Sequence, residues 1–240
     1  MSDSVTDYRR KVIAAHPAAF QLHTEIGSTL QDATKTSRAH PTEAHIVLDM
    51  LMIQAGKAHA AVSILAQHGM MEDTATIARR LMELGVQALY IGGESEKKER
   101  QKRAGTYLAF MWRQLQPRIK HRLPPGARHA WSTIARRYGR FVRSTAKTWG
   151  PNWRDMFRAI GNEPLYVKDY SFLSAIAHGR PDNQFFTFSS STIRVHGHEF
   201  APALLNYSSR YYLVVAEQWN RCFNILAQES FDRLVRAAMA

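Results

Sequence analysis

The residues best suited to chemistry lie on two segments, 71–93 and 164–178, and both segments carry apolar residues at helical spacing. In the second segment, Tyr170, Ser174 and His178 are four residues apart and therefore share one stripe of a helix. A histidine beside a serine can act as a general base for a nucleophile. Side chains at i and i+4 seldom converge on a third atom, so a role in packing two helices together is the alternative.

The first segment places Arg80, Glu83 and Gln87 along the flank of an apolar helical stripe. Arg80 and Glu83 have the spacing of an intrahelical ion pair, and they are equally able to hold a polar partner from another helix. If the two helices meet, a metal-independent active site between them is one interpretation, and a polar helix junction is the other. The predicted catalytic residues are Arg80, Glu83, Ser174 and His178, and the predicted junction residues are Tyr170 and Gln87.

A basic region extends over residues 97–158. It holds 17 Lys and Arg against Glu99 and Asp155, a net charge of +15 in a chain whose total is +12. A positive charge this concentrated attracts phosphate, whereas a merely solvated face carries charges of both signs. An anionic partner is therefore expected, nucleic acid first, with an acidic protein and a solvated surface as the alternatives.

Aromatic residues alternate with the charges of this region, and flat rings can stack on exposed bases. The aromatic residues are Tyr107, Trp112, Trp131, Tyr138, Phe141, Trp149 and Trp153. The residues predicted to bind nucleic acid are Arg136, Arg137, Arg140, Arg143 and Lys147.

No motif for a metal or a cofactor stands out. His196 and His198 alternate with Gly197 beside Glu199, but a His-x-His pair alone is a weak metal signal. The chain contains no phosphate-binding loop, dinucleotide fingerprint or His-Glu-x-x-His motif. We predict neither a metal site nor a cofactor.

The elements that must position these residues are almost all helices. Residues 1–38 read as an N-terminal helical segment, and residues 39–240 as a helical bundle domain that includes the basic region. Two β-prone runs around a Ser-rich turn predict a hairpin at 184–200, and Pro202 is expected to open one long terminal helix. The predicted fold class is therefore all-α, a multi-helix bundle with one small β-hairpin before the C-terminal helix.

Composition indicates an ordinary soluble protein, with 45% hydrophobic and 22% charged residues. The first residues contain acids where a signal peptide needs a basic start, and no apolar run follows. Asp49 and His59 interrupt the most apolar stretch, 44–66, which argues against a membrane span. Because Cys222 is the only cysteine, no intrachain disulfide can form. A cytoplasmic location without membrane contact is expected.

Three motifs carry a family resemblance: RLME at 80–83, WGPNWRDMFRAIG at 149–161 and YVKDYSFLSAIAHG at 166–179. In this order they resemble a bacterial helical family known only as a domain of unknown function, and the resemblance covers roughly residues 40 to 235. It implies an all-helical fold and no established activity. The family positions carried over are Arg80, Glu83, Tyr170, Ser174 and His178.

A more distant similarity is to the HEPN superfamily of helical nucleotide-binding and RNase domains. Its usual mark is an arginine followed on the same helix, after about four to six residues, by a histidine, and no arginine stands at that spacing before His178. The similar pairs Arg38 to His45 and Arg122 to His129 have a proline in between. A HEPN-type RNase with the usual motif is therefore not expected, although Arg80 and His178 could still meet across helices.

The sequence thus predicts a cytoplasmic bacterial helical protein that binds nucleic acid or another polyanion through residues 97–158, in antiviral defence or as a toxin. The alternatives are a metal-independent nuclease between the Arg80 and His178 helices, and an interaction module that docks an acidic partner. A homodimer is compatible with each of these functions.

Overall fold

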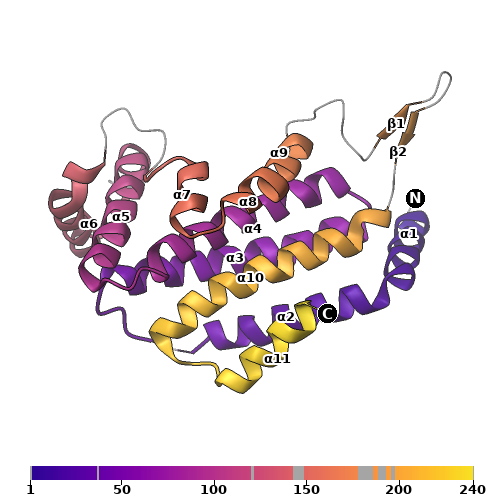
Figure 1. Cartoon of the computed structure of the whole chain (residues 1–240), viewed down its shortest axis with the longest axis horizontal. Coiled ribbons are helices and arrows are strands. Elements are labelled where there is room, and N and C mark those ends of the chain that lie inside the picture. Colours follow the sequence, from indigo (N-terminus) through magenta and orange to yellow (C-terminus); the bar gives the residue numbers. More distant parts are fainter. Residues whose placement is uncertain are drawn as a thin grey trace.

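The computed structural model describes residues 2–36, 38–119, 122–142, 149–177, 186–188, 193–195 and 198–239. Its centre consists of three long helices that lie side by side, α3 (Glu43–Gln67), α4 (Met71–Gly92) and α10 (Ala201–Phe223) (Figure 1). Helix α2 (Pro17–Thr34) packs against α3 and α10. The all-α bundle is confirmed.

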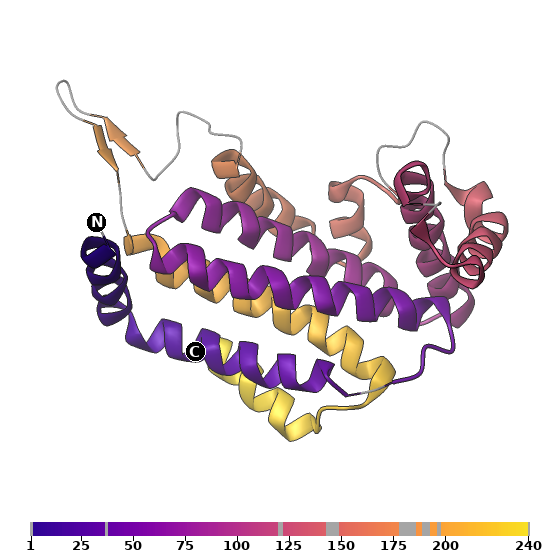
Figure 2. The ribbon, with the colours of Figure 1, turned by 180° about the vertical axis from the view of Figure 1, so that it is seen from behind.

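The central helices are long because their apolar residues repeat at helical spacing, which buries one face of each helix in the core. In α3 and α4, Leu51, Met52, Leu81 and Met82 are fully buried, and they belong to one core together with Trp219 of α10. Each aliphatic side chain buried in this way contributes about 1.5–3 kcal/mol. Seen from behind, α3 and α4 lie in front of α10 (Figure 2).

The turn between α3 and α4 depends on Gly69. Its φ of +72° lies in the left-handed region, and the Met70 N–H donates to the Leu65 carbonyl at 3.0 Å. This is the usual way for a glycine to end a helix. The turn makes α3 and α4 antiparallel neighbours. Arg79, Arg80 and Glu83 therefore lie on a helix that is packed against α3.

The chain after Pro202 forms two helices instead of one. Asn224 adopts a left-handed conformation with φ 49°, and its N–H donates to Asn220 O at 2.7 Å. Helix α11 (Gln228–Met239) then folds back against α2 and α10. The prediction of one uninterrupted terminal helix was wrong, because a single asparagine in the left-handed region breaks it.

At one end of the molecule, α5 (Lys97–Ile119) and α6 (Pro125–Tyr138) pack together, and α6 continues into a 3₁₀ turn, η2 (Gly139–Phe141) (Figure 1). A β-carbon on Gly105 of α5 would lie only 2.4 Å from the Tyr138 ring, so this approach requires a glycine. The two helices of the basic region therefore pack closely as one unit.

Between this unit and α10 the chain runs along α4. It forms α7 (Trp153–Ala159), the short α8 (Glu163–Leu165), a π-helical turn η3 (Tyr166–Tyr170) and α9 (Ser171–Ala177), and α9 packs on α4. The stripe that begins at Tyr170 therefore does meet the helix that carries Glu83.

At the opposite end of the molecule, α1 (Ser2–Ala15) lies near a short pair of strands (Figure 1). The strands β1 (Phe186–Phe188) and β2 (Ile193–Val195) pair antiparallel over three residues each. A hairpin filling 184–200 is not seen, since residues 198–200 form a 3₁₀ turn, η4, that leads into α10. Within the described ranges, no helix is long and apolar enough to cross a membrane.

Candidate nucleic-acid interface

An open groove of about 680 Å³ lies in the basic region, between the start of α5 and the end of α6. We call it the basic groove. The stretch that precedes α3 closes one side of it. Its lining residues are Thr42, Glu43, Glu96, Lys97, Lys98, Gln101, Lys102, Arg137, Tyr138, Arg140 and Phe141. The groove therefore contains five cationic side chains and two carboxylates.

Three of these cations have no carboxylate partner. In the part of the chain that the structure describes, no ion pair joins Lys97, Lys98 or Arg140 to an acid, and all three residues are exposed. Lys102 is bound by Glu99 at 3.1 Å. The positive charge of the groove is therefore only partly neutralised, and an anion entering it would meet unpaired ammonium and guanidinium groups.

Glu43, in the first turn of α3, contacts two residues of the groove wall that the end of α6 forms. Its Oε1 accepts a hydrogen bond from the Tyr138 hydroxyl at 3.1 Å and lies 3.4 Å from Arg137 Nη1. Burial and the Glu43 carboxylate raise the pKa of Tyr138, so this phenol remains a neutral donor. Because the Arg137 side chain is 70% exposed, its ion pair is weak and can be exchanged for a phosphate.

The residues predicted to bind nucleic acid divide into two groups. Arg137 and Arg140 line the basic groove, whereas Arg136 is exposed on α6, where its Nη2 donates to Thr133 Oγ1 at 3.5 Å. Arg143 and Lys147 lie outside the described residues.

Most of the aromatic residues of the basic region are not available for stacking on bases. Tyr107, Trp112, Tyr138 and Trp149 are each 9% exposed or less, and they pack in the interior. Trp131 and Trp153 are partly buried, and Phe141 is the most exposed of the set, with 39% of its surface accessible. Stacking on bases is therefore open to few of these rings, because most of them pack in the interior.

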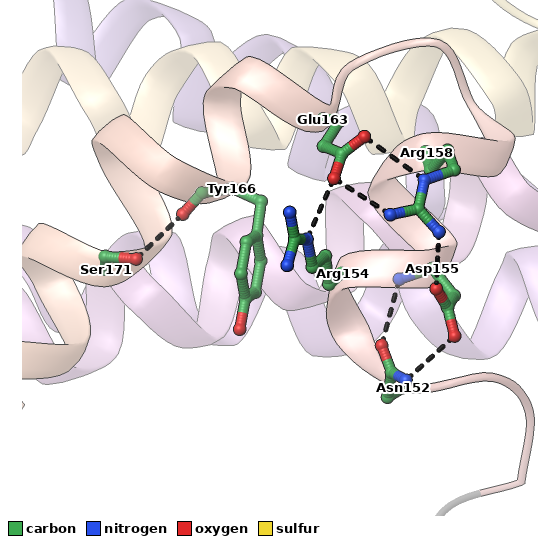
Figure 3. A network of polar contacts seen from close by, with 7 residues as sticks. All are labelled: Asn152, Arg154, Asp155, Arg158, Glu163, Tyr166 and Ser171. Carbon is green, nitrogen blue, oxygen red and sulfur yellow. Dashed lines mark hydrogen bonds and ion pairs between the residues drawn. The ribbon is translucent and has the colours of Figure 1, made fainter.

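Two other cations of the region, Arg154 and Arg158, are neutralised by acids. Glu163 lies between the guanidinium groups of Arg154 and Arg158, at 2.8 Å from Arg154 Nε and 3.0 Å from Arg158 Nη2 (Figure 3). Hydrogen bonds from Arg158 and Arg154 lower the pKa of Glu163 to about 2. Asp155 takes a further contact with Arg158 at 3.0 Å. This network keeps α7 and α8 together and adds little free positive charge.

At the predicted site between α4 and α9, the arginine that contacts Tyr170 is Arg79 and not Arg80. Arg79 Nη2 donates to the Tyr170 hydroxyl at 3.1 Å, and the Arg79 guanidinium lies 5.1 Å from the Tyr170 ring centroid. Glu83 pairs with both neighbouring arginines, at 3.3 Å from Arg79 Nε and 3.3 Å from Arg80 Nη1. Arg80 was predicted to meet the Tyr170 stripe, whereas its Nη2 donates to Gln54 of α3 at 3.3 Å. Successive residues on a helix point about 100° apart, which explains the exchange.

Of the remaining predicted site residues, the structure describes Ser174 and Gln87. Ser174 is half-buried on α9, and His178 lies outside the described residues. Gln87 is buried at 5% exposure, and its Oε1 has no hydrogen-bond partner in the described structure. Among the described residues, then, Arg79 joins Glu83 to Tyr170, and Arg80 is attached to the same group only through Glu83.

A polar cluster that was not predicted surrounds Asp49 of α3. Arg38 Nε donates to Asp49 Oδ1 at 2.6 Å, Trp219 Nε1 donates to the same oxygen at 3.0 Å, and His40 Nε2 lies 3.0 Å from Oδ2. Burial alone would raise the pKa of Asp49, but the hydrogen bonds from Trp219, His40 and Arg38 together hold it below its usual value. The carboxylate therefore joins the stretch before α3 to α10.

Arg38 of this cluster and His45, whose spacing is close to that of the HEPN motif, meet at Phe223. Pro41 separates Arg38 from the helix, as expected, yet Arg38 and His45 both pack on Phe223, at 5.6 and 5.3 Å from its ring centroid. Burial, and then the nearby His40 and Arg100, lower the pKa of His45. Since Thr42 contacts His45 Nδ1 at 2.7 Å and also lines the basic groove, the two regions are neighbours.

A stacked pair of histidines lies inside the bundle, and it too was not predicted. The His23 and His59 rings are parallel within 3°, with centroids 3.5 Å apart, and both are almost fully buried. His23 Nε2 is 3.0 Å from Ser208 Oγ, and His59 Nε2 is 3.4 Å from Ser209 Oγ. Burial lowers the pKa of His23 to about 3 and that of His59 well below its usual value. This pair belongs to the core, because solvent does not reach it.

The His-x-His pair that gave a weak metal signal is only half described, because His196 lies outside the described residues. His198 contacts His16, and His198 Nδ1 lies 3.1 Å from His16 Nε2. The described residues contain no group of three or more histidines, cysteines or carboxylates that could hold a metal ion.

Comparison with known proteins gives one match. The model of a family of unknown function, DUF5677, matches residues 45–189, more than half of the chain. The resemblance predicted from the three motifs is confirmed. No curated protein and no solved structure matches significantly.

Proposed function

Given that the chain belongs to DUF5677, a family of unknown function, we propose that it binds nucleic acid, or another polyanion, through the basic groove. The observation that carries this proposal is the set of unpaired cations, Lys97, Lys98 and Arg140, on the two walls of one hollow. Cations gathered in a concave site act together on a polyphosphate, whereas the same charges spread over a convex surface would act singly.

The distribution of acids supports this assignment. Acids outside or at the edge of the basic region neutralise some of its other cations, as Glu94 does for Arg103 at 2.6 Å and Glu163 does for Arg154 and Arg158. The groove itself has five cations and only two carboxylates, so part of its positive charge stays unbalanced. A phosphate chain that follows the groove would replace the weak Arg137–Glu43 pair by a stronger contact.

The test is a charge reversal of the groove with a control of equal charge. Arg137→Glu with Arg140→Glu changes the net charge by −4, and so does Arg233→Glu with Arg236→Glu on the exposed face of α11. Binding of a labelled oligonucleotide should weaken at least tenfold for the groove variant and much less for the α11 variant. Equal weakening by both variants would show that only the net charge matters, and the proposal would be lost.

An acidic protein partner would be drawn to the same cations. The ultraviolet absorbance ratio of the protein purified at low salt distinguishes the two ligands, because copurified nucleic acid raises it and an acidic protein does not. A cytoplasmic location, and a role in antiviral defence or as a toxin, belong to the same proposal and need tests in cells.

A second candidate is a metal-independent nuclease at the α4–α9 junction, with Arg80, Glu83, Ser174 and His178 as the reacting groups. It is favoured by Glu83, which lies 3.3 Å from Arg79 Nε and 3.3 Å from Arg80 Nη1. Incubation with RNA and DNA in the presence of a chelator tests it. Cleavage that His178→Ala removes would support this activity, and absence of cleavage by the unmodified protein would exclude it.

A further inference from the structure

Phe141 is the one large apolar side chain that the basic groove exposes. It ends the 3₁₀ turn η2, and 39% of its surface is accessible. Lys102 Nζ lies 5.2 Å from its ring centroid, and Arg140 Cζ lies 4.9 Å from it. The ring therefore lies beside an ammonium group from α5 and a guanidinium group from η2, at the place where the groove is positively charged.

This arrangement is suited to a ligand with both phosphates and unpaired bases. A cation near a ring at these distances contributes only about 0.5–1 kcal/mol at an exposed site. A phosphate binds either cation more strongly, through a charge-assisted hydrogen bond. Once phosphates draw Lys102 and Arg140 aside, the faces of the Phe141 ring become available, and a nucleobase is the flat group that a nucleic acid brings with its phosphates.

We propose that the basic groove takes single-stranded nucleic acid, with an unpaired base stacked on Phe141 and the flanking phosphates bound by Lys102 and Arg140. This inference rests on the proposed nucleic-acid binding and gives it a substrate class. In a duplex the base faces are already covered by their neighbours, so a ring on the wall of a groove can meet only the sugar–phosphate backbone. Stacking on aromatic side chains is the general means by which proteins hold single strands without reading sequence.

The experiment measures the affinity of three probes at one low salt concentration: a labelled single-stranded oligouridine of about ten nucleotides, a duplex of similar charge, and heparin. The variants are Phe141→Leu, which keeps an apolar side chain without a π-face, and Phe141→Trp, which enlarges the face. Circular dichroism controls for folding, and loss of fold is not expected because Phe141 is exposed.

For Phe141→Leu we expect single-strand affinity to fall about 5- to 150-fold, the range for loss of one stacked base. Affinity for duplex and heparin should change less than twofold, and Phe141→Trp should bind the single strand at least as well as the unmodified protein. The inference is overturned if Phe141→Leu leaves single-strand affinity unchanged, or lowers it no more than duplex affinity.

The outcomes separate this inference from the function on which it rests. If Arg137→Glu with Arg140→Glu abolishes binding of all three probes while Phe141→Leu alters none, the groove binds polyanions and the stacking is refuted. If the unmodified protein binds none of the probes, the proposed function and this inference are both refuted.

Discussion

Acidification is expected to destabilise the fold through the stacked histidines His23 and His59. The Ser208 hydroxyl donates to the Leu205 carbonyl at 2.8 Å, so its oxygen is left to accept from His23 Nε2–H at 3.0 Å. Both rings are buried face to face, and a proton on either would place a charge in the core. The folded state therefore holds both histidines neutral, while the unfolded chain protonates them near pH 6.5.

The size of the effect follows from the pKa of His23, which is about 3 in the folded protein. Between pH 6.5 and about 3 the unfolded state binds more protons, so the free energy of unfolding falls as the pH is lowered. From pH 7 to pH 5 His23 alone accounts for a loss of about 2 kcal/mol. His59, whose pKa is lowered in the same direction by burial and by His23, adds a loss of the same sign.

Urea unfolding at pH 7 and pH 5, followed by circular dichroism, measures this loss. The informative variant is His23→Phe, which keeps a flat ring against His59 but cannot be protonated. Its free energy of unfolding should fall by about 2 kcal/mol less than that of the unmodified protein over the same pH range. Ser208→Ala is the matched control, because it removes the hydrogen bond and leaves both titrating rings in place.

The control should lower stability by a similar amount at both pH values, and its pH dependence should remain that of the unmodified protein. If His23→Phe retains the full loss between pH 7 and pH 5, the histidine pair does not stay neutral in the folded state, and the reasoning is refuted.

Two further pairs of substitutions test packing and charge elsewhere. Gly105→Ala should lower the free energy of unfolding by about 1–3 kcal/mol, because the new methyl group meets the Tyr138 ring. It should also weaken oligonucleotide binding by displacing α6. The control Gly126→Ala, whose methyl group enters open space in α6, should leave both measurements nearly unchanged. Asp49→Ala should cost about 3–5 kcal/mol in urea unfolding, since it strands the buried Arg38 guanidinium. Asp49→Asn keeps the volume but not the charge and should still cost a large part of this; no loss from Asp49→Asn would mean that the ion pair contributes nothing beyond its volume.

The helical architecture could be predicted because α3, α4 and α10 are long and strongly periodic. The break at Asn224 could not, because one residue in the left-handed region leaves no mark on the apolar pattern around it. The short strands β1 and β2 were indicated by composition, but their length depends on pairing, which β-propensity does not specify.

The candidate sites were predicted less completely. Charge counting located the basic region, but it could not show that Glu43 and Glu163, which lie outside 97–158, neutralise part of it. Arg79 and Arg80 are adjacent, and only the packing of α9 decides which of them meets Tyr170. Asp49 and His59 were visible as polar interruptions of an apolar stretch, which is the signal that could have indicated a buried polar cluster.

The most direct test of the account is the salt dependence of single-strand binding. Three to five groove cations that contact phosphates predict a slope of log Kobs against log salt concentration of about −2 to −3.5, at roughly 0.7 per contact. Arg137→Glu with Arg140→Glu should make this slope shallower by about 1.4. A slope near zero for the unmodified protein, or a slope that the double variant leaves unchanged, would contradict binding through the basic groove.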